Sequence, residues 1–132
     1  MIIFLYSIAA AAALIYVPFL LVAYARARIG YETFSTPRAM FDKLPPYAQR
    51  ATWAHQNTFE AFMVFAAAAL MAYVTGVNSF TAQVVAIAFV VARLLYSIFY
   101  ILNIPLLRSL MFAIGIFSCG TLFFLSIIQT SS

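Results

Sequence analysis

The sequence predicts an all-α integral membrane protein built as a bundle of four transmembrane helices. Of its 132 residues, 67% are hydrophobic and only 8% are charged, and the mean hydropathy is +1.06. A soluble domain is about a quarter charged, so this chain has too few polar groups to cover a surface in water. Four long apolar stretches, separated by short segments that contain proline, glycine or asparagine, supply the helices.

The first helix is expected over residues 3–27. This apolar run has no basic residue before it, whereas a cleavable signal peptide has a basic start and an apolar stretch of only about 7–15 residues. The run is long enough to span a bilayer, so we expect the helix to be retained. Pro18 lies inside it, and a kink is expected there because proline removes one backbone hydrogen bond.

The remaining helices are separated by clear breaks. Residues 29–46 are polar and contain three of the five prolines, which predicts a loop. Gly76-Val-Asn-Ser79 predicts a tight turn, and Asn103-Ile-Pro105 breaks the chain again. The expected ranges of the second, third and fourth helices are 47–75, 80–102 and 106–128. We therefore expect residues 1–132 to form a single membrane domain.

The loop charges gather at one end of the predicted bundle. They are Arg26, Arg28, Arg38, Lys43 and Arg50 in or beside the first loop, and Arg108 beside the third. The second loop and both termini carry no charged side chain. Because basic residues in short loops mark the cytoplasmic side, loops one and three are expected in the cytoplasm and both termini on the other side.

The same charges argue against several other classes of protein. The net charge of +4 is spread over loops and helix ends, and no basic run could follow a nucleic-acid backbone. Cys119 is the single cysteine, which excludes an intramolecular disulfide and a multi-cysteine zinc site. We therefore expect neither a nucleic-acid partner nor a metal centre.

Two charges lie far from the ends of the predicted helices. Glu60 and Arg93 both sit roughly 15–20 Å from the end of the bundle that carries loops one and three, at a rise of 1.5 Å per residue. Ionisable groups at that depth are costly and are candidates for function. An ion pair between them is expected, and it could also serve only as a packing lock between helices.

Polar neighbours extend both positions into stripes. Residues 50, 53, 57 and 60 are spaced for one face of the second helix, with His55 on its flank, and residues 93, 96 and 100 for one face of the third. The candidate binding residues in these stripes are Arg50, His55, Asn57, Glu60, Arg93, Tyr96 and Tyr100. Their cations, amide, imidazole and phenols suit a small, polar, anionic ligand.

Two motifs in these stripes resemble the MAPEG family, the membrane-associated proteins in eicosanoid and glutathione metabolism. The first is Arg50-Ala-Thr-Trp-Ala-His-Gln-Asn57-Thr-Phe-Glu60, similar to an arginine followed by Asn-x-x-Glu in that family. The second is Ala92-Arg93-Leu-Leu-Tyr96-Ser-Ile-Phe-Tyr100, similar to Ala-Arg-x-x-Tyr-x-x-x-Tyr. Length, hydropathy and four spans fit as well, so the resemblance covers most of the chain.

The resemblance implies a homotrimer that binds glutathione between adjacent subunits near the cytoplasmic face. The seven candidate binding residues would then line the glutathione site, with Glu60 taking the amino group. Trp53 stands where several members have a second arginine, so one carboxylate clamp is missing here. Arg108 resembles the arginine that faces the glutathione sulfur in active members, and is the candidate catalytic residue.

The implied chemistry is sound for these residue types. A free thiol has a pKa near 8.5, and a guanidinium keeps its charge and favours the thiolate. Arg108 is also expected in the first turn of the fourth helix, where the helix dipole favours negative charge.

Three functions are compatible with this reading. The first is a glutathione transferase or peroxidase whose lipophilic electrophile or lipid hydroperoxide enters from the bilayer. The alternative is a non-catalytic lipid-binding or scaffold protein of the same fold. A small exporter of cationic drugs is disfavoured, because that class needs a carboxylate in the first helix and none is present.

Overall fold

The computed structural model describes residues 2–30 and 32–132. Four of its helices are long and apolar enough to cross a membrane, which confirms the predicted fold class. They are α1 (Ile2–Ile29), α3 (Pro46–Val74), α4 (Phe80–Ile101) and α5 (Pro105–Ser131). Each lies within about three residues of the range expected from the sequence.

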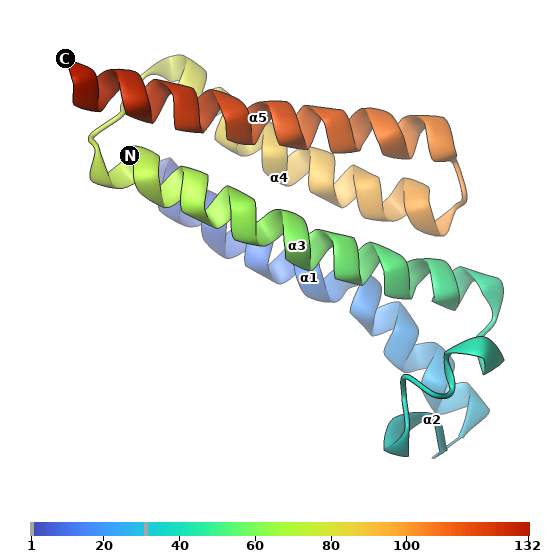
Figure 1. Cartoon of the computed structure of the whole chain (residues 1–132). Coiled ribbons are helices and arrows are strands. Elements are labelled where there is room, and N and C mark those ends of the chain that lie inside the picture. The colour runs from blue at the N-terminus through green and yellow to red at the C-terminus, as the bar shows by residue number, and fades with distance from the viewer. Residues whose placement is uncertain (1, 31) are drawn as a thin grey trace.

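The four helices form two close pairs that pack on each other. α1 lies beside α3, and α4 lies beside α5 (Figure 1). α3 also contacts both α4 and α5, and α1 contacts α4, so both helices of the first pair pack on the second pair. Both chain termini lie at one end of the bundle, and the α1–α3 connection and the α4–α5 turn lie at the other (Figure 1).

The segment expected as a plain loop over residues 29–46 contains short regular structure. α1 continues to Ile29, and a four-residue helix α2 (Glu32–Ser35) and a 3-10 turn (Phe41–Lys43) follow. A helix of one turn is too short to leave a periodic pattern in the sequence, so this part of the loop expectation is wrong. Pro18 lies inside a continuous α1.

Local residue chemistry explains the helix ends. Pro46 and Pro105 occupy the first positions of α3 and α5, where the missing N–H would have no partner in any case. The Ala82 backbone N–H donates to Ser79 Oγ over 3.2 Å and caps α4. Asn103 takes a positive φ of 61° in the α4–α5 turn, a conformation that asparagine tolerates better than most residues.

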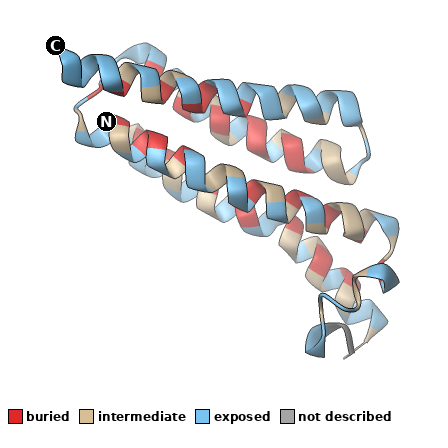
Figure 2. Ribbon diagram, in the orientation of Figure 1, coloured by how far each residue is buried: buried red, intermediate tan, exposed pale blue. Residues whose placement is uncertain are grey.

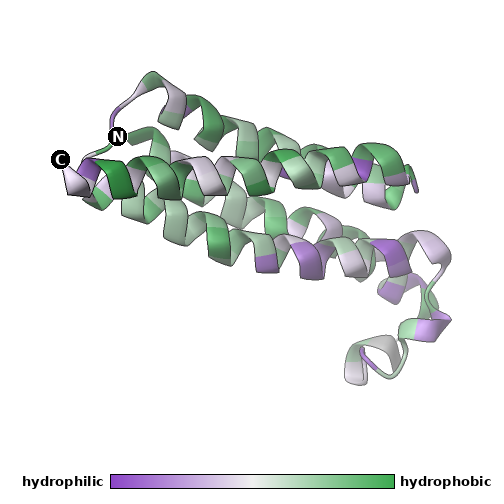
Figure 3. Ribbon diagram, turned by 45° about the horizontal axis from the view of Figure 1, so that its top comes forward, coloured by the Kyte–Doolittle hydropathy of each residue, from purple (hydrophilic) through white to green (hydrophobic). Residues whose placement is uncertain are grey.

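Small residues let the helices approach closely. Fully buried alanines run along the packed side of α3, and Phe65 of α3 stacks on Phe89 of α4 with ring centroids 4.0 Å apart. Buried residues lie where helices meet, and the outer faces are exposed (Figure 2). Those outer faces are strongly apolar, while the hydrophilic positions on the helices lie mainly toward the α2 end (Figure 3). This is the pattern of a bundle surrounded by lipid.

Candidate functional site

Arg93 is the deepest cation in the bundle. It is only 2% exposed on α4, and its Nη2 donates to Asn57 Oδ1 and to Thr58 Oγ1, each over 3.0 Å. Its guanidinium carbon lies 3.9 Å from the centroid of the Tyr96 ring, a cation–π distance. Arg93 is therefore held by two neutral oxygens and one aromatic face.

The expected ion pair between Glu60 and Arg93 is not formed among the described residues. Glu60 lies on the exposed side of α3, whereas the inward-facing oxygens on that helix belong to Asn57 and Thr58. Arg93 donates to Asn57 and Thr58 rather than to Glu60, because these two neutral acceptors lie on the side of α3 that faces α4. The ion-pair prediction is wrong for this chain, and the Glu60 carboxylate remains available to a ligand.

Polar side chains of α3 and α4 surround a shallow depression, here called the polar hollow. Its lining residues are Trp53, Gln56, Asn57, Glu60, Tyr96 and Tyr100. α3 supplies the first four and α4 the two tyrosines, whose rings meet edge to face at 5.6 Å. The two polar stripes of the sequence thus converge at one place, offering a carboxylate, two amides and two phenols.

A second depression adjoins the polar hollow and is here called the apolar pocket. It has a volume of about 210 Å³ and lies between α3, α4 and α5. Its lining residues are Asn57, Glu60, Ala61, Val64, Phe89, Arg93, Phe112, Gly115, Ile116 and Cys119. Because Asn57 and Glu60 line both depressions, a polar and an apolar chamber share one wall.

Trp53 lines the polar hollow at its outer end. Its ring lies 5.7 Å from that of Phe41, in the connection before α3, and 6.5 Å from that of Tyr100. It is 43% exposed, so somewhat less than half of its surface remains available for contact. The tryptophan therefore forms an aromatic edge of the hollow, at a position where an arginine would have offered a charge.

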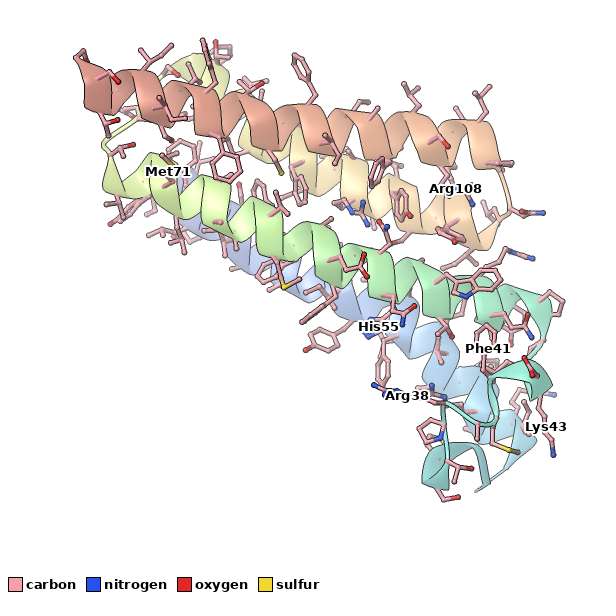
Figure 4. The ribbon with its side chains drawn as sticks, in the orientation of Figure 1. Arg38, Phe41, Lys43, His55, Met71 and Arg108 are labelled. Carbon is pink, nitrogen blue, oxygen red and sulfur yellow. The ribbon has the colours of Figure 1, made fainter. Side chains whose placement is uncertain are left out.

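Arg108 and Arg50 border the hollow but are not among its lining residues. The Arg108 guanidinium carbon lies 4.6 Å from the centroid of the Tyr100 ring, and Figure 4 shows Arg108 near the start of α5, beside α4. Arg50 Nε donates to the Ile101 carbonyl over 3.0 Å. Arg50 therefore caps the C-terminal end of α4, while Arg108 is one aromatic ring away from the hollow.

His55 points away from the hollow, toward α1 (Figure 4). Its Nδ1 lies 2.7 Å from the Ile15 carbonyl oxygen, and its ring lies 5.3 Å from that of Phe19. A carbonyl can only accept, so the proton is on Nδ1. Ile15 is three residues before Pro18, whose missing N–H leaves the Leu14 carbonyl of the same turn without its usual helical donor. The structure thus separates His55 from the other candidate binding residues.

Two residues of this region were not singled out from the sequence. Gln56 lines the polar hollow, and Thr58 accepts from Arg93 and lies 3.5 Å from Ser97 Oγ. Gln56 is three residues after Trp53 and four before Glu60, so helical spacing alone could have added it to the α3 stripe. The contact of Thr58 with Arg93 could not be predicted from spacing along α3, because it depends on how α4 packs against α3.

A comparison with family models supports what the motifs indicate. Residues 3–128, nearly the whole chain, match the model of the MAPEG family. This chain is a MAPEG protein. No curated protein and no solved structure matches it. As a MAPEG protein with four candidate spans, it is an integral membrane protein associated with glutathione and eicosanoid metabolism.

Proposed function

We propose that this MAPEG protein is a membrane-bound glutathione-dependent transferase or peroxidase that acts on lipophilic electrophiles or lipid hydroperoxides. The observation that carries the proposal is the pair of depressions with a shared wall at Asn57 and Glu60. One chamber suits a hydrophilic tripeptide and the other suits an apolar molecule. A reaction between the two classes of molecule needs both chambers to be adjacent.

The residues of the polar hollow fit the groups of glutathione. Glu60 is exposed and forms no ion pair among the described residues, so its carboxylate can take an ammonium group. The Gln56 amide and the phenols of Tyr96 and Tyr100 can donate to carboxylates and peptide carbonyls. Arg50 has one nitrogen engaged with the Ile101 carbonyl, and its remaining donors can add a further contact.

Arg108 is the residue we assign to the sulfur. Glutathione, when bound, supplies the thiolate that adds to an electrophile or reduces a hydroperoxide. Arg108 lies in the first turn of α5 and against Tyr100, which lines the hollow. A permanent cation combined with the positive end of a helix stabilises a nearby anion. His55, held by Ile15 on the α1 side, receives no role in binding.

We propose that the working form is a homotrimer, with the hollow completed by a neighbouring subunit. The hollow is shallow and its wall is formed by two helices, so a second wall would enclose the ligand. Large apolar side chains are exposed around the bundle and can serve such a contact as well as lipid. Native mass spectrometry of the detergent-solubilised protein would give the subunit count, and a monomer would contradict this proposal.

The activity is tested on purified protein by two measurements. Calorimetry should detect glutathione binding, and turnover should appear with a chromogenic aryl halide or cumene hydroperoxide. Glu60→Gln should weaken glutathione binding at least tenfold because it removes the partner of the ammonium group, while Tyr73→Phe, on exposed α3 surface far from the hollow, should not change it.

The outcomes separate the two functions of this fold. Absence of both glutathione binding and turnover would refute the enzyme proposal. Lipid binding in the apolar pocket without glutathione binding would favour the alternative, a non-catalytic lipid-binding or scaffold protein.

A further inference from the structure

The polar hollow combines aromatic rings with a single formal charge, which is negative. Its lining residues are one carboxylate, two amides, two phenols and an indole, and Glu60 carries the only charge among them. Arg50 and Arg108 border the hollow without lining it. The face of an aromatic ring is negative as well, so a surface of this composition attracts an organic cation.

Both tyrosine rings of the hollow already have a cation against them. The guanidinium carbon of Arg93 lies 3.9 Å from the centroid of Tyr96, and that of Arg108 lies 4.6 Å from the centroid of Tyr100. The indole of Trp53 has no cation over it in the part of the chain that the structure describes, although tryptophan is the strongest cation–π partner. Because 43% of Trp53 is exposed, its ring is the aromatic surface of the hollow that remains open.

Glu60 is the matching anion, and it lacks a counter-charge. It is exposed and forms no ion pair among the described residues, although it lies within a membrane span, where a lone charge is costly. Glu60 follows Trp53 by two helical turns, so the two side chains share one face of α3, about 10 Å apart along the axis. A cation within about 6 Å of the indole centroid can therefore contact the carboxylate as well.

We propose that the polar hollow binds a trimethylammonium group, held between the Glu60 carboxylate and the Trp53 indole. Such a cation has no N–H donor to leave unsatisfied against an aromatic ring, and it costs less to desolvate than a strongly hydrated primary ammonium. The volume of the hollow is about 210 Å³, which suits a compact group, since pockets that enclose a whole ligand are typically about 300–1,000 Å³. Phe41 of the α1–α3 connection lies against Trp53, so ligands from water reach the indole at that end.

This binding needs no glutathione, so it goes beyond the proposed enzyme activity. One consequence rests on that activity. Glu60 is also the residue that we assign to the ammonium group of glutathione, so a trimethylammonium group in the hollow excludes the tripeptide. A compound that carries this group, free or as the head group of a lipid, then inhibits the enzyme competitively with respect to glutathione.

Trp53 makes the site directly observable, because it is the single tryptophan of the chain. Its fluorescence is followed while the full chain, in an uncharged maltoside detergent and without glutathione, is titrated with two pairs of probes. The first pair is choline and its neutral analogue, in which carbon replaces the charged nitrogen. The second pair is a short-chain phosphatidylcholine and the phosphatidylglycerol of the same chain length.

The expected result is a saturable fluorescence change with choline, with the phosphatidylcholine, or with both. It should occur at a concentration about tenfold or more below that of the matching probe without the cation. Saturation by choline identifies a soluble ligand, and saturation by the phosphatidylcholine alone identifies a lipid head group. No saturable response to either trimethylammonium probe, or an equal response to its matching probe, would overturn the proposal.

Glu60→Gln tests the anionic side of the site. It should weaken the tighter trimethylammonium probe about three- to tenfold, between the scales of an exposed and a desolvated charge pair. Asp42→Asn is the matched control, because it removes an exposed carboxylate that does not line the hollow, and it should leave the affinity unchanged. Equal losses in the two variants would show a general attraction of cations to the protein and would contradict a site at Glu60.

Trp53→Leu tests the aromatic side, with calorimetry in place of fluorescence. It should weaken the same probe about three- to thirtyfold, the scale of a cation–π contact, whereas Trp53→Phe keeps a ring and should retain part of the affinity. Trp53 and Glu60 are both exposed, so neither replacement removes a buried hydrogen bond. Unchanged affinity in Trp53→Leu would refute the proposal.

Competition is measured last, and only the consequence for the enzyme depends on it. Saturating choline, or the phosphatidylcholine if that is the tighter probe, should raise the apparent dissociation constant for glutathione in calorimetry. Simultaneous binding of both ligands would contradict the shared use of Glu60. Absence of any glutathione binding would refute the proposed enzyme activity and leave the fluorescence result for the trimethylammonium probes intact.

Discussion

Arg93 shows how a cation is kept inside an apolar bundle without an acid beside it. Asn57 and Thr58 accept from the same nitrogen, and the Tyr96 ring covers the guanidinium. Hydrogen bonds to charged groups contribute about 1.5–3 kcal/mol each, so the neutral set offsets part of the cost of burying the charge. The arrangement also leaves Glu60 uncommitted, which is what a ligand-binding carboxylate requires.

Thr58→Val tests the contribution of one of these acceptors. Valine has nearly the same shape but no oxygen, so Arg93 keeps only Asn57 as a side-chain acceptor. We expect the free energy of unfolding to fall by about 1–3 kcal/mol, measured by denaturant titration in detergent. Thr58→Ser retains the hydroxyl and is the control. Equal losses in the two variants would show that packing, and not the hydrogen bond, stabilises this position.

Arg108→Ala tests the assignment of the residue that faces the sulfur. If Arg108 stabilises the thiolate in the reaction, turnover should fall by about a hundredfold, while the dissociation constant for glutathione changes little. Arg108→Lys retains a charge and should recover part of the rate. Parallel losses in turnover and in affinity, measured by steady-state kinetics and calorimetry, would move Arg108 from catalysis to binding.

At the residue scale, the sequence predicted which side chains of the candidate site share a helix face, because helical spacing decides this. The structure brings Asn57, Glu60, Tyr96 and Tyr100 together around one hollow. The partners of Arg93 and of His55 could not be predicted in the same way. They depend on how α4 and α1 are rotated against α3, and spacing along one helix contains no information on rotation between helices.

At the scale of the elements, a side-chain hydrogen bond from His55 of α3 links that helix to the backbone of α1. His55 Nδ1–H donates to the Ile15 carbonyl over 2.7 Å, close to Pro18. A backbone carbonyl near a proline in a membrane helix often needs an outside donor, because lipid offers none. His55 therefore stabilises the turn of α1 that proline weakens.

His55→Leu should destabilise this helix pair without affecting glutathione. We expect a loss of about 0.5–1.5 kcal/mol in the free energy of unfolding and an unchanged dissociation constant for glutathione. Thermal unfolding in detergent and calorimetry would measure the two quantities. The family resemblance implied that His55 binds glutathione. Weakened glutathione binding in the variant would therefore support that role and contradict our assignment.

The long helices could be predicted because each is a span of apolar residues bounded by proline, glycine or asparagine. α2 could not, since four residues (Glu32–Ser35) carry no periodic signal. The sequence predicts the end of α1 at residue 27, between Arg26 and Arg28, whereas the helix continues to Ile29. In the structure these arginines occupy the last turn of the helix, where cations interact favourably with the helix dipole.

At the scale of the whole molecule, four spans put both termini and the α3–α4 turn at one end (Figure 1). The basic residues of the connections lie at the other end, which we expect to face the cytoplasm. Cys119→Ser provides a cysteine-free background in which Lys43→Cys and Ser132→Cys mark the two ends. A membrane-impermeant maleimide added to intact cells should label position 132 and not position 43, and the reverse pattern would refute the orientation.

Formal charge divides unevenly between the two ends of this bundle. Glu60 and Arg93 cancel inside the spans, so the entire net charge of +4 belongs to the end with α2. A resting membrane potential acts on that charge directly, at about 2.3 kcal/mol per elementary charge for each 100 mV. With the cytoplasm negative, inverting the molecule would cost about 9 kcal/mol at 100 mV. If the α2 end faces the cytoplasm, as we expect, the electric field across the membrane opposes inversion of the bundle.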